Sequence, residues 1–422
     1  MTARPNARPL AQHVSVLRDL TREGMGLGDL DVLGDLVQGA RVVGIGEGAH
    51  FVHEFATARM HLVHFLVERC GFTHVALEIG RAQAAQLEPW VRGDLAASEL
   101  SSCAGPLTRG LYGSFLRWLR AYNAGRSSPV RLIGPDLPNT LTISSDLDVL
   151  DTYLREVDPP TLPVLAEAQH VAAKIEGGSA AVSAFAWAAL DVGERERLSA
   201  RLAQLALRLS ALEPLFLERG GTAAFHHAMH HLEAARHTDQ MLRAMSDLFS
   251  GAGLPADTSI RDRFAATSLS AMLAREPADA RVVVVAHNNH IQKKPVSFDG
   301  ELTAIPMGCY LSRELGERYR AVGLTHLGQR VPEMSFPEPE SPVGFGVGLV
   351  ALSAPAPDSI EHALVEAGLH DVGTLVDMRG GARSLGLSRI RSQSASVTVP
   401  LHEAFDAIVA VPAASVEPEL PF

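Results

Sequence analysis

Cysteine is scarce in this chain of 422 residues, which contains three: Cys70, Cys103 and Cys309. An odd number at wide spacing argues against a disulfide framework and is typical of reduced thiols in a cytoplasm. Free cysteine is most often a small buried side chain, so we expect all three to fill the core rather than to react.

Long apolar runs are also missing. The longest weakly polar run, residues 343–357, is interrupted by glycine and proline and is shorter than the roughly 20 apolar residues of a spanning helix. The first ten residues contain two arginines but no apolar segment with a cleavage site after them, so we expect no secretory signal. These absences predict a cytoplasmic protein without a membrane partner.

An excess of positive charge is the third absence. The chain has 37 lysines and arginines against 48 aspartates and glutamates, a formal net charge of -11. A nucleic-acid partner requires a concentrated basic face, so we expect none. The hydrophobic share of 46% is typical of a globular protein.

The segment from Val42 to Glu78 organises the rest of the chain. Two short apolar runs, residues 42–45 and 73–77, flank a stretch that is compatible with a helix. This pattern predicts a β-α-β unit with parallel strands. Each strand ends in a charged group, and ligands of open parallel sheets bind beyond the carboxyl ends of the strands. We therefore expect the active-site crevice at this edge.

Other short apolar or periodic segments predict the remaining elements. Further strands are expected at 130–134, 281–286, 319–325, 374–377 and 405–411, and helices at 81–92, 115–122 and 359–366. Residues 9–40 are expected to form one or two helices, because one apolar face recurs at helical spacing. That face consists of Leu10, Val14, Leu17 and Leu20.

Between residues 144 and 250 the composition changes to alanine, leucine, arginine and glutamate, almost without β-branched clusters. Such residues favour helices. We predict a helical insertion subdomain at 144–250 that stands over the crevice and can act as a lid. Residues 1–143 and 251–422 then form an α/β catalytic core with a mainly parallel central sheet flanked by helices.

Charged side chains and histidines gather where the predicted strands end. Because parallel strands end at one edge of the sheet, we expect these side chains to meet in one crevice. Structural ion-pair networks also gather charge, so a purely structural role is the competing interpretation. Arg59 would point away from a helix that began at His50, so we place His50 in the loop before the helix. The candidates are Glu47, His50, Arg59, Glu78, Asp136, Arg261, His287 and His290.

Three common catalytic or binding motifs have to be weighed against this interpretation. Residues 44–49 fit the dinucleotide pattern G-x-G-x-x-A, with Glu78 as the ribose-binding acid, but Glu47 in the turn would repel a pyrophosphate. His53 and Glu54 are not followed by the second histidine of a zinc protease, and no G-x-S-x-G follows a strand. A serine nucleophile and a zinc protease are therefore not supported.

Residues 226–231 place two histidine pairs four residues apart, a spacing that can bind a metal on one face of a helix. No acid or cysteine accompanies them in the sequence. A solvated helix face is therefore the favoured interpretation, and metal binding by this cluster stays open.

Several motifs together resemble one known family, the erythromycin esterases, and most of all the type II macrolide esterases of bacterial antibiotic resistance. The resemblance runs from about residue 9 to about residue 412. It rests on Gly46–His50 with Glu54 and Arg59, and on Asp136–Thr140, Ser259–Asp262, Ala286–His290, Pro295–Ala304 and Arg391–Ser396.

The resemblance implies a fold, an activity and a set of catalytic residues. The fold is an α/β core with a helical subdomain over the cleft. The activity is hydrolysis of the macrolactone ester of 14-membered macrolides such as erythromycin, with water as co-substrate and without a metal, another cofactor or an acyl-enzyme. The essential histidine is His50, supported by Glu47, Arg59, Glu78, His287 and His290.

A mechanism follows as a hypothesis. Neutral His50, with an ordinary pKa near ~6.5, would take a proton from water while Glu47 or Glu78 orients it. A donor from Arg59, Arg261 or His287 would stabilise the developing oxyanion. Asp136 and Arg261 are assigned to substrate binding.

Three alternatives remain open. A metal-dependent hydrolase would use His50, His287, His290 and Glu47 or Glu78 as ligands. A biosynthetic esterase would act on a different lactone. A binding protein would sequester a macrolide without turnover.

Overall fold

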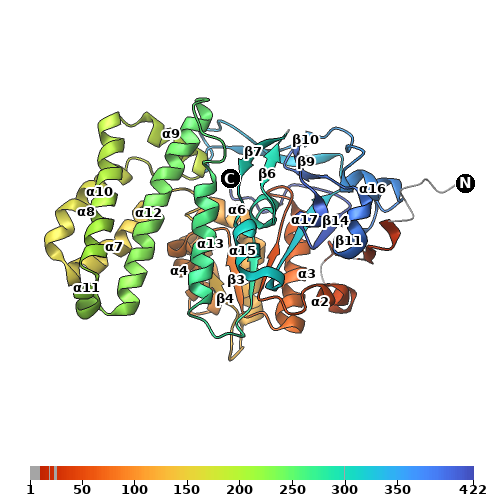
Figure 1. Ribbon diagram of the computed structural model, residues 1–422, viewed down its shortest axis with the longest axis horizontal. Coiled ribbons are helices and arrows are strands. Elements are labelled where there is room, and N and C mark those ends of the chain that lie inside the picture. Colours follow the sequence, from red (N-terminus) through yellow and green to blue (C-terminus); the bar gives the residue numbers. More distant parts are fainter. Residues whose placement is uncertain (1–9, 19, 23–25, 299) are drawn as a thin grey trace, which may run out of the picture.

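The computed structural model describes residues 10–18, 20–22, 26–298 and 300–422. An eight-stranded sheet forms its centre, in the order β1-β11-β14-β8-β2-β5-β3-β4 (Figure 1). The six strands from β14 to β4 are parallel, and β11 and β1 join one edge antiparallel. This confirms the predicted α/β class. The strands are β1 (Val14–Leu17), β2 (Val42–Ile45), β3 (His74–Leu77), β4 (Arg131–Ile133), β5 (Val282–Val285), β8 (Tyr319–His326), β11 (Gly373–Asp377) and β14 (Ala407–Val411).

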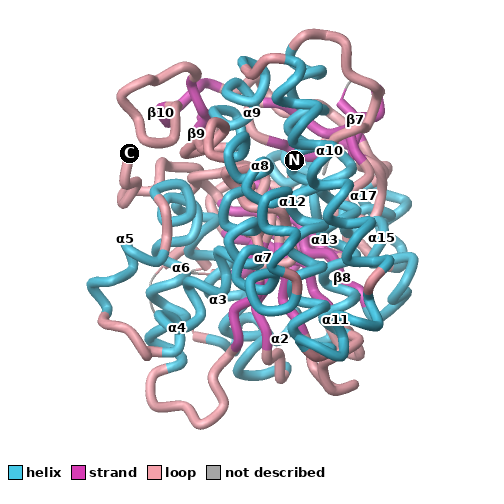
Figure 2. The backbone as a smooth tube through the Cα atoms, turned by 90° about the vertical axis from the view of Figure 1, so that its left-hand side faces the viewer, coloured by secondary structure: helices cyan, strands magenta, loops and turns pink. Residues whose placement is uncertain are grey.

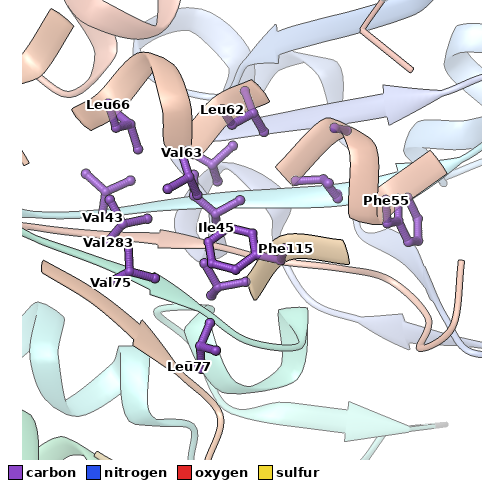
Figure 3. Packing of buried hydrophobic residues seen from close by; sticks show 14 of the residues in the cluster. Val43, Ile45, Phe55, Leu62, Val63, Leu66, Val75, Leu77, Phe115 and Val283 are labelled. Carbon is purple, nitrogen blue, oxygen red and sulfur yellow. The ribbon is translucent and has the colours of Figure 1, made fainter. Parts of the chain in front are cut away.

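The central strands are apolar throughout because both faces of the sheet are covered. Alternate residues point to opposite faces. Val43, Val75 and Val283 pack on one face beneath Leu62 and Val63 (Figure 3). The intervening residues of the same strands pack on the opposite face, against a second group of helices.

Helices of the α/β core cover these two faces. One face carries α3 (His53–Cys70), α4 (Arg81–Arg92) and α6 (Pro106–Asn123), and the other carries α13 (Ser259–Leu273) and α15 (Met307–Leu315). Helix α4 agrees with the helix expected at 81–92, and the helix at 360–366 agrees closely with the one expected at 359–366. Shorter helices complete the core. These are α2 (Asp31–Leu36), α5 (Leu100–Cys103), α14 (Asn288–Ile291), α16 (Ile360–Glu366) and α17 (Leu401–Ala404).

A bundle of helices stands beside the sheet, at the left of Figure 1 and towards the viewer in Figure 2. It has a hydrophobic core of its own, which includes Trp187 and Phe216. These helices occupy the stretch for which the composition predicts helix, and the role of a lid stays a prediction. They are α7 (Ser144–Val157), α8 (Leu162–Ala172), α9 (Ala180–Ala189), α10 (Val192–Ala211), α11 (Glu213–Gly220) and α12 (Thr222–Phe249).

The prediction of one or two helices over residues 9–40 is wrong at Val14–Leu17, which form β1. This segment pairs with β11, and the two valines suit a pleated strand, so tertiary pairing overrides the helical periodicity. A 3₁₀ turn at Leu27–Leu30 and helix α2 follow. Residues 9, 19 and 23–25 lie outside the described residues, as do residues 1–9 of the segment in which no secretory signal is expected.

Three small hairpins of the described residues form separate two-stranded sheets outside the central sheet. Two of them, β6-β7 and β12-β13, contribute residues to the cleft described below, and β9 of the third does as well. Among the described helices, none combines the length and apolar character that crossing a membrane requires. All three cysteines are free, with Cys309 buried and the other two partly buried. The hairpin strands are β6 (Val296–Phe298), β7 (Glu301–Ala304), β9 (Arg330–Ser335), β10 (Gly346–Ala351), β12 (Arg389–Ser392) and β13 (Ala395–Thr398).

Gly46 follows β2 and leaves room for a buried asparagine. A Cβ atom on Gly46 would lie 1.9 Å from Oδ1 of Asn288. The Asn288 side chain accepts from Leu324 N–H at 3.0 Å and donates to Leu324 O at 2.7 Å, so it joins the end of β5 to β8. Its backbone N–H donates to Glu47 O at 2.9 Å. The glycine of this motif therefore serves internal packing, which is a different use from cradling a pyrophosphate.

We expect Gly46→Ala to lower the free energy of unfolding by roughly 1 to 3 kcal/mol, because the methyl group displaces Asn288 from its bonds to Leu324. Urea unfolding followed by circular dichroism measures this. Gly28→Ala is the control, since nothing lies within 4 Å of a Cβ atom there. Equal midpoints for the two variants would contradict the assigned role of Gly46.

Candidate active site

Polar side chains follow the carboxyl ends of four neighbouring parallel strands and lie at one edge of the sheet. Glu47 and His50 follow β2, and Glu78 follows β3. Asp136 follows β4, and His287 lies two residues after the end of β5, at the N-cap of α14. Since parallel strands end at the same edge, the fold brings together residues that are far apart in the sequence.

Glu47 holds His50 in one orientation. Its Oε1 lies 2.7 Å from Nδ1 of His50, and its Oε2 lies 2.8 Å from Nη2 of Arg59. Nδ1 of His50 therefore donates its hydrogen to the carboxylate, and in the neutral ring Nε2 is left as an acceptor. Helix α3 begins at His53, so His50 lies in the preceding loop as expected, and Arg59 reaches back from α3.

Neighbouring charges shift the pKa values of Glu47 and His50 in opposite directions. Burial disfavours the carboxylate of Glu47, but the charge of Arg59 and the hydrogen bond from His50 outweigh it, so the pKa of Glu47 is lowered. Burial alone would lower the pKa of His50. The hydrogen bond to Glu47 and the charges of Glu47 and Glu78 outweigh burial and raise the pKa of His50 above 6.5.

The loop that carries His50 is held from the opposite side by the turn of the β12-β13 hairpin. The backbone N–H of His50 donates to Oε1 of Gln393 at 2.6 Å, and Nε2 of Gln393 donates to Glu333 at 3.1 Å. Phe51, next to His50, has a φ angle of 62°, which costs free energy in a bulky residue. A strained backbone beside the histidine is typical of a functional loop.

Glu78 is the centre of a second network. Its Oε2 accepts from the backbone N–H of His287 at 2.9 Å, and its Oε1 accepts from Nη2 of Arg261 at 2.6 Å. Arg261 also binds Asp136 through Nε and Nη2, at 3.0 and 2.7 Å. Burial opposes the charge of Glu78, but His290 and Arg261 outweigh it and hold its pKa well below 4.5.

His287 is neutral, and its hydrogen can be placed. Nδ1 accepts from the backbone N–H of Asn289 at 3.1 Å, so the hydrogen of the neutral ring is on Nε2. Burial and the charge of His50 lower the pKa of His287 to about 3. Within the described residues Nε2 has no hydrogen-bond partner, and the ring lies 5.0 Å from that of His50, centre to centre. A free N–H donor thus lies beside the free acceptor of His50.

His290 has the opposite protonation. Its Nδ1 lies 2.9 Å from Oδ1 of Asp262, and its Nε2 lies 3.3 Å from Oε1 of Glu78. Burial lowers the pKa of His290, but the charges of Asp262 and Glu78 outweigh it and raise the pKa to about 10. The ring is therefore an imidazolium at neutral pH.

A cleft of about 410 Å³ opens over these groups. His50, His287, His290 and Arg261 line it. Behind them, Glu47, Glu78 and Asp136 contact these lining groups, and Arg59 contacts Glu47. Apolar side chains from the bundle, the hairpins and their connections form the remaining walls. They include Met241, Val296, Phe298, Ala304, Met334 and Ala395.

Two residues of the site had no assigned role in the sequence. Asp262 follows Arg261, and besides His290 its Oδ1 accepts from the backbone N–H of Met307 at 2.8 Å. Gln393 lies within the motif 391–396. Both belong to stretches that carry the family resemblance, and this resemblance was the signal that could have found them. Nothing in the sequence indicated which distant residues they contact.

The histidine cluster at 226–231 lies on α12. Among the described residues no group of three histidines, cysteines or acids has an arrangement that could hold a metal ion. His226 and His227 are exposed, in line with the expected solvated face. His231 differs, since it is buried and its Nδ1 lies 2.6 Å from Oδ1 of Asp146.

Taken together, a carboxylate-held imidazole, a free N–H donor and an imidazolium meet at the carboxyl ends of a parallel sheet, where enzymes of this fold class bind their ligands. The family of proteins described as erythromycin esterase matches residues 67–414. The chain belongs to the erythromycin esterase family, as its motifs predicted.

Two individual relatives support the same family. An erythromycin esterase type I of Escherichia coli is 40% identical over 388 residues, covering 92% of this chain and 94% of the relative. A type II enzyme of the same organism is 30% identical over 397 residues, covering 92% and 93%. Of these two, the type I enzyme is the more similar, so the expected closer likeness to type II is not what the identities show.

The fold has a close counterpart among solved structures. A mutant of the erythromycin esterase EreC in its open conformation superimposes with a TM-score of 0.92 at 38% identity. The superposition covers 97% of this chain and 100% of that one. The mixed α/β fold is therefore shared over nearly the whole length.

We expect Asp262→Asn to lower the pKa of His290 from about 10 towards 6.5, because one of the two carboxylates that stabilise the imidazolium is removed. NMR titration of histidine-labelled protein measures it. Asp279→Asn, in an exposed loop, is the control and should leave that pKa unchanged. An unaltered pKa of His290 in the Asp262 variant would contradict the charge assignment.

Proposed function

We propose that this chain hydrolyses the lactone ester of 14-membered macrolides such as erythromycin. One observation carries the proposal: Glu47 holds His50 at 2.7 Å, with the His287 ring 5.0 Å away. This geometry offers an acceptor for a water proton and a donor for an oxyanion at one place in a cleft. Family membership supports the same ester chemistry and implies a role in antibiotic resistance. A cytoplasmic location is part of the proposal.

The first step uses His50 as a base. Nε2 takes a proton from water as the water oxygen attacks the lactone carbonyl, and Glu47 stabilises the imidazolium that forms. Arg59 keeps Glu47 in place through the bond at 2.8 Å and does not line the cleft. We therefore assign Arg59 a positioning role, acting through Glu47.

The second step needs a donor for the tetrahedral oxyanion. Nε2 of His287 is preorganised for this, because its hydrogen is not used elsewhere in the described residues. A fixed donor that costs no reorganisation is usually the larger part of such catalysis. Collapse of the intermediate breaks the ester C–O bond, and the proton held by His50 passes to the leaving alkoxide, which gives a hydroxy acid.

His290 and Arg261 add positive charge at the cleft wall. Glu78 binds both, and Asp136 binds Arg261, so the two acids set the position of the two cations. We propose that Arg261 contacts the substrate directly. Asp136 then contributes to substrate binding through Arg261, since both of its oxygens already accept hydrogen bonds.

The walls of the cleft suit a large, mostly apolar ring. Met241 from α12 contributes to the lining together with Met334 from β9 and Val296 and Phe298 from β6. Methionine adapts its shape to irregular ligands. The bundle therefore forms one wall of the substrate site, and we propose that its movement relative to the sheet opens and closes the cleft.

A metal-dependent mechanism is the second candidate, and the donor set does not favour it. Nδ1 of His287 accepts a backbone N–H, and both nitrogens of His290 face carboxylates within 3.3 Å. A metal ion would have to break these contacts to gain its ligands. The described residues contain no group of three donors suited to a metal.

We expect His50→Ala to lower kcat by roughly 10²- to 10⁴-fold, because the water loses its base. Mass spectrometry after incubation with erythromycin measures the gain of one water. His170→Ala, an exposed histidine of α8, is the control and should retain full activity. Full activity of the His50 variant would contradict the base assignment.

The same assay separates the alternatives. Loss of activity in a chelator, restored by a divalent ion, would favour the metal-dependent hydrolase. Tight binding of erythromycin with unchanged mass would favour a sequestering protein. Turnover of other lactones but not of macrolides would favour a biosynthetic esterase.

We expect a bell-shaped dependence of kcat/KM on pH, because kcat/KM reports the pKa values of the free enzyme. The base works only when neutral, so the rate rises with pH as His50 loses its proton, at a pKa above 6.5. The rate falls again as His290 loses its charge near pH 10. Initial rates across the pH range measure both limbs. An acid limb below the 6.5 of a free histidine would contradict the raised pKa of His50.

A further inference from the structure

A groove separate from the catalytic cleft lies between α4, α12 and α13. Two cavities of about 300 and 380 Å³ adjoin in it, and both are lined by Arg81, His230, Ser268 and Arg275. Helices α12 and α13 lie side by side in both views (Figures 1 and 2). The groove therefore has one wall from the bundle and two from the α/β core.

Arg81 and Arg275, the two arginines that line both cavities, have no counter-ion among the described residues. Arg81 begins α4 and is half-buried, and Arg275 lies just beyond the end of α13. Within the described residues neither guanidinium takes part in an ion pair or a side-chain hydrogen bond. Burial and the charge of Arg275 lower the pKa of Arg81. Arg81 is a half-buried cation that faces a second cation and no paired acid, and an anion between the two arginines would offset their repulsion.

The acids that line the groove are engaged elsewhere. Glu276 pairs with Arg131 at 2.8 Å, and Glu88 accepts the backbone N–H of Leu132 at 2.8 Å. Glu233 pairs with Arg236 at 2.7 Å. The positive charge of the two arginines is therefore not neutralised by these three acids.

The histidines of the groove agree with an excess of positive charge. Burial and nearby cations, Arg81 among them, lower the pKa of His227 to about 4 and of His230 to about 2. Both rings are neutral at neutral pH. Nε2 of His230 is buried and has no hydrogen-bond partner in the part of the chain that the structure describes. Such an atom calls for a partner that is not part of the protein.

We propose that this groove binds a phosphate group, as inorganic phosphate or as a small phosphomonoester, between Arg81 and Arg275, with His230 and Ser268 as further hydrogen-bonding groups. Guanidinium groups match phosphate oxygens with paired hydrogen bonds, which favours phosphate over a smaller anion. The two cavities leave room beyond the phosphate for the rest of an ester.

Occupancy would link the bundle to the core. Helix α12 carries His230 in the groove and Met241 in the catalytic cleft. Helix α13 likewise carries Ser268 in the groove and Arg261 in the cleft. An anion held by α4, α12 and α13 therefore fastens helices that also shape the substrate site. The binding itself does not depend on the proposed esterase activity.

Titration of the full chain with sodium phosphate tests the proposal. We use about pH 8, where phosphate is largely a dianion, and sodium chloride of equal ionic strength as reference. We expect saturable heat in calorimetry and a phosphate-dependent rise in Tm. Arg275→Gln and Arg81→Gln should each weaken binding by roughly tenfold or more, because a charge-assisted pair is lost.

Arg92→Gln, at the exposed far end of α4, is the matched control and should bind phosphate as the unsubstituted chain does. Arg275 is exposed, so its substitution keeps the test valid even if the Arg81 variant fails to fold. NMR adds an independent readout: bound phosphate should raise the pKa of His230, since an anion stabilises the imidazolium.

Tighter binding of glycerol phosphate than of inorganic phosphate would assign the site to an ester, and the reverse order would assign it to the free ion. The proposal is overturned if chloride produces the same rise in Tm as phosphate. It is also overturned if Arg275→Gln binds phosphate as tightly as Arg92→Gln does.

Discussion

The largely buried carboxylate of Glu78 makes the interactions on which the catalytic cleft depends. It accepts the backbone N–H of His287 and the guanidinium of Arg261, so one anion joins the ends of β3 and β5 to α13. Arg261 extends the connection to Asp136 and so to β4. Without this carboxylate, Arg261 and His290 would be partly buried cations that each keep a single carboxylate partner, Asp136 and Asp262 respectively, so more than one hydrogen bond would be lost.

Much of this arrangement follows from the sequence by simple geometry. Glu47, Glu78 and His287 come within two residues of apolar runs, and parallel pairing alone brings the ends of such runs to one edge. The helix at 81–92 was predicted from its sequence pattern, and in the structure glycines bound it on both sides. The position of His50 before α3 followed from the rotation per residue, since Arg59 had to face the same site.

The remainder depends on pairings that local sequence does not encode. Val14–Leu17 carry a helical apolar period, yet they form a strand because the edge of β11 is available to them. Gln393 binds the backbone of His50 across 343 residues, and nothing near either residue indicates the other. The tautomer of His287 depends on one backbone N–H of Asn289, which becomes visible only in three dimensions.

Asn288 shows how closely the two histidine-bearing loops are joined. Its backbone binds Glu47 O, its side chain binds Leu324, and Gly46 leaves it no spare room. Neither loop can therefore lengthen or shift without disturbing the other. Diversification of substrate range would have to occur in peripheral parts such as α12 and the β6-β7 hairpin, which line the cleft but are not tied into this junction. The architecture thus separates a tightly joined catalytic part from a recognition surface with fewer internal constraints.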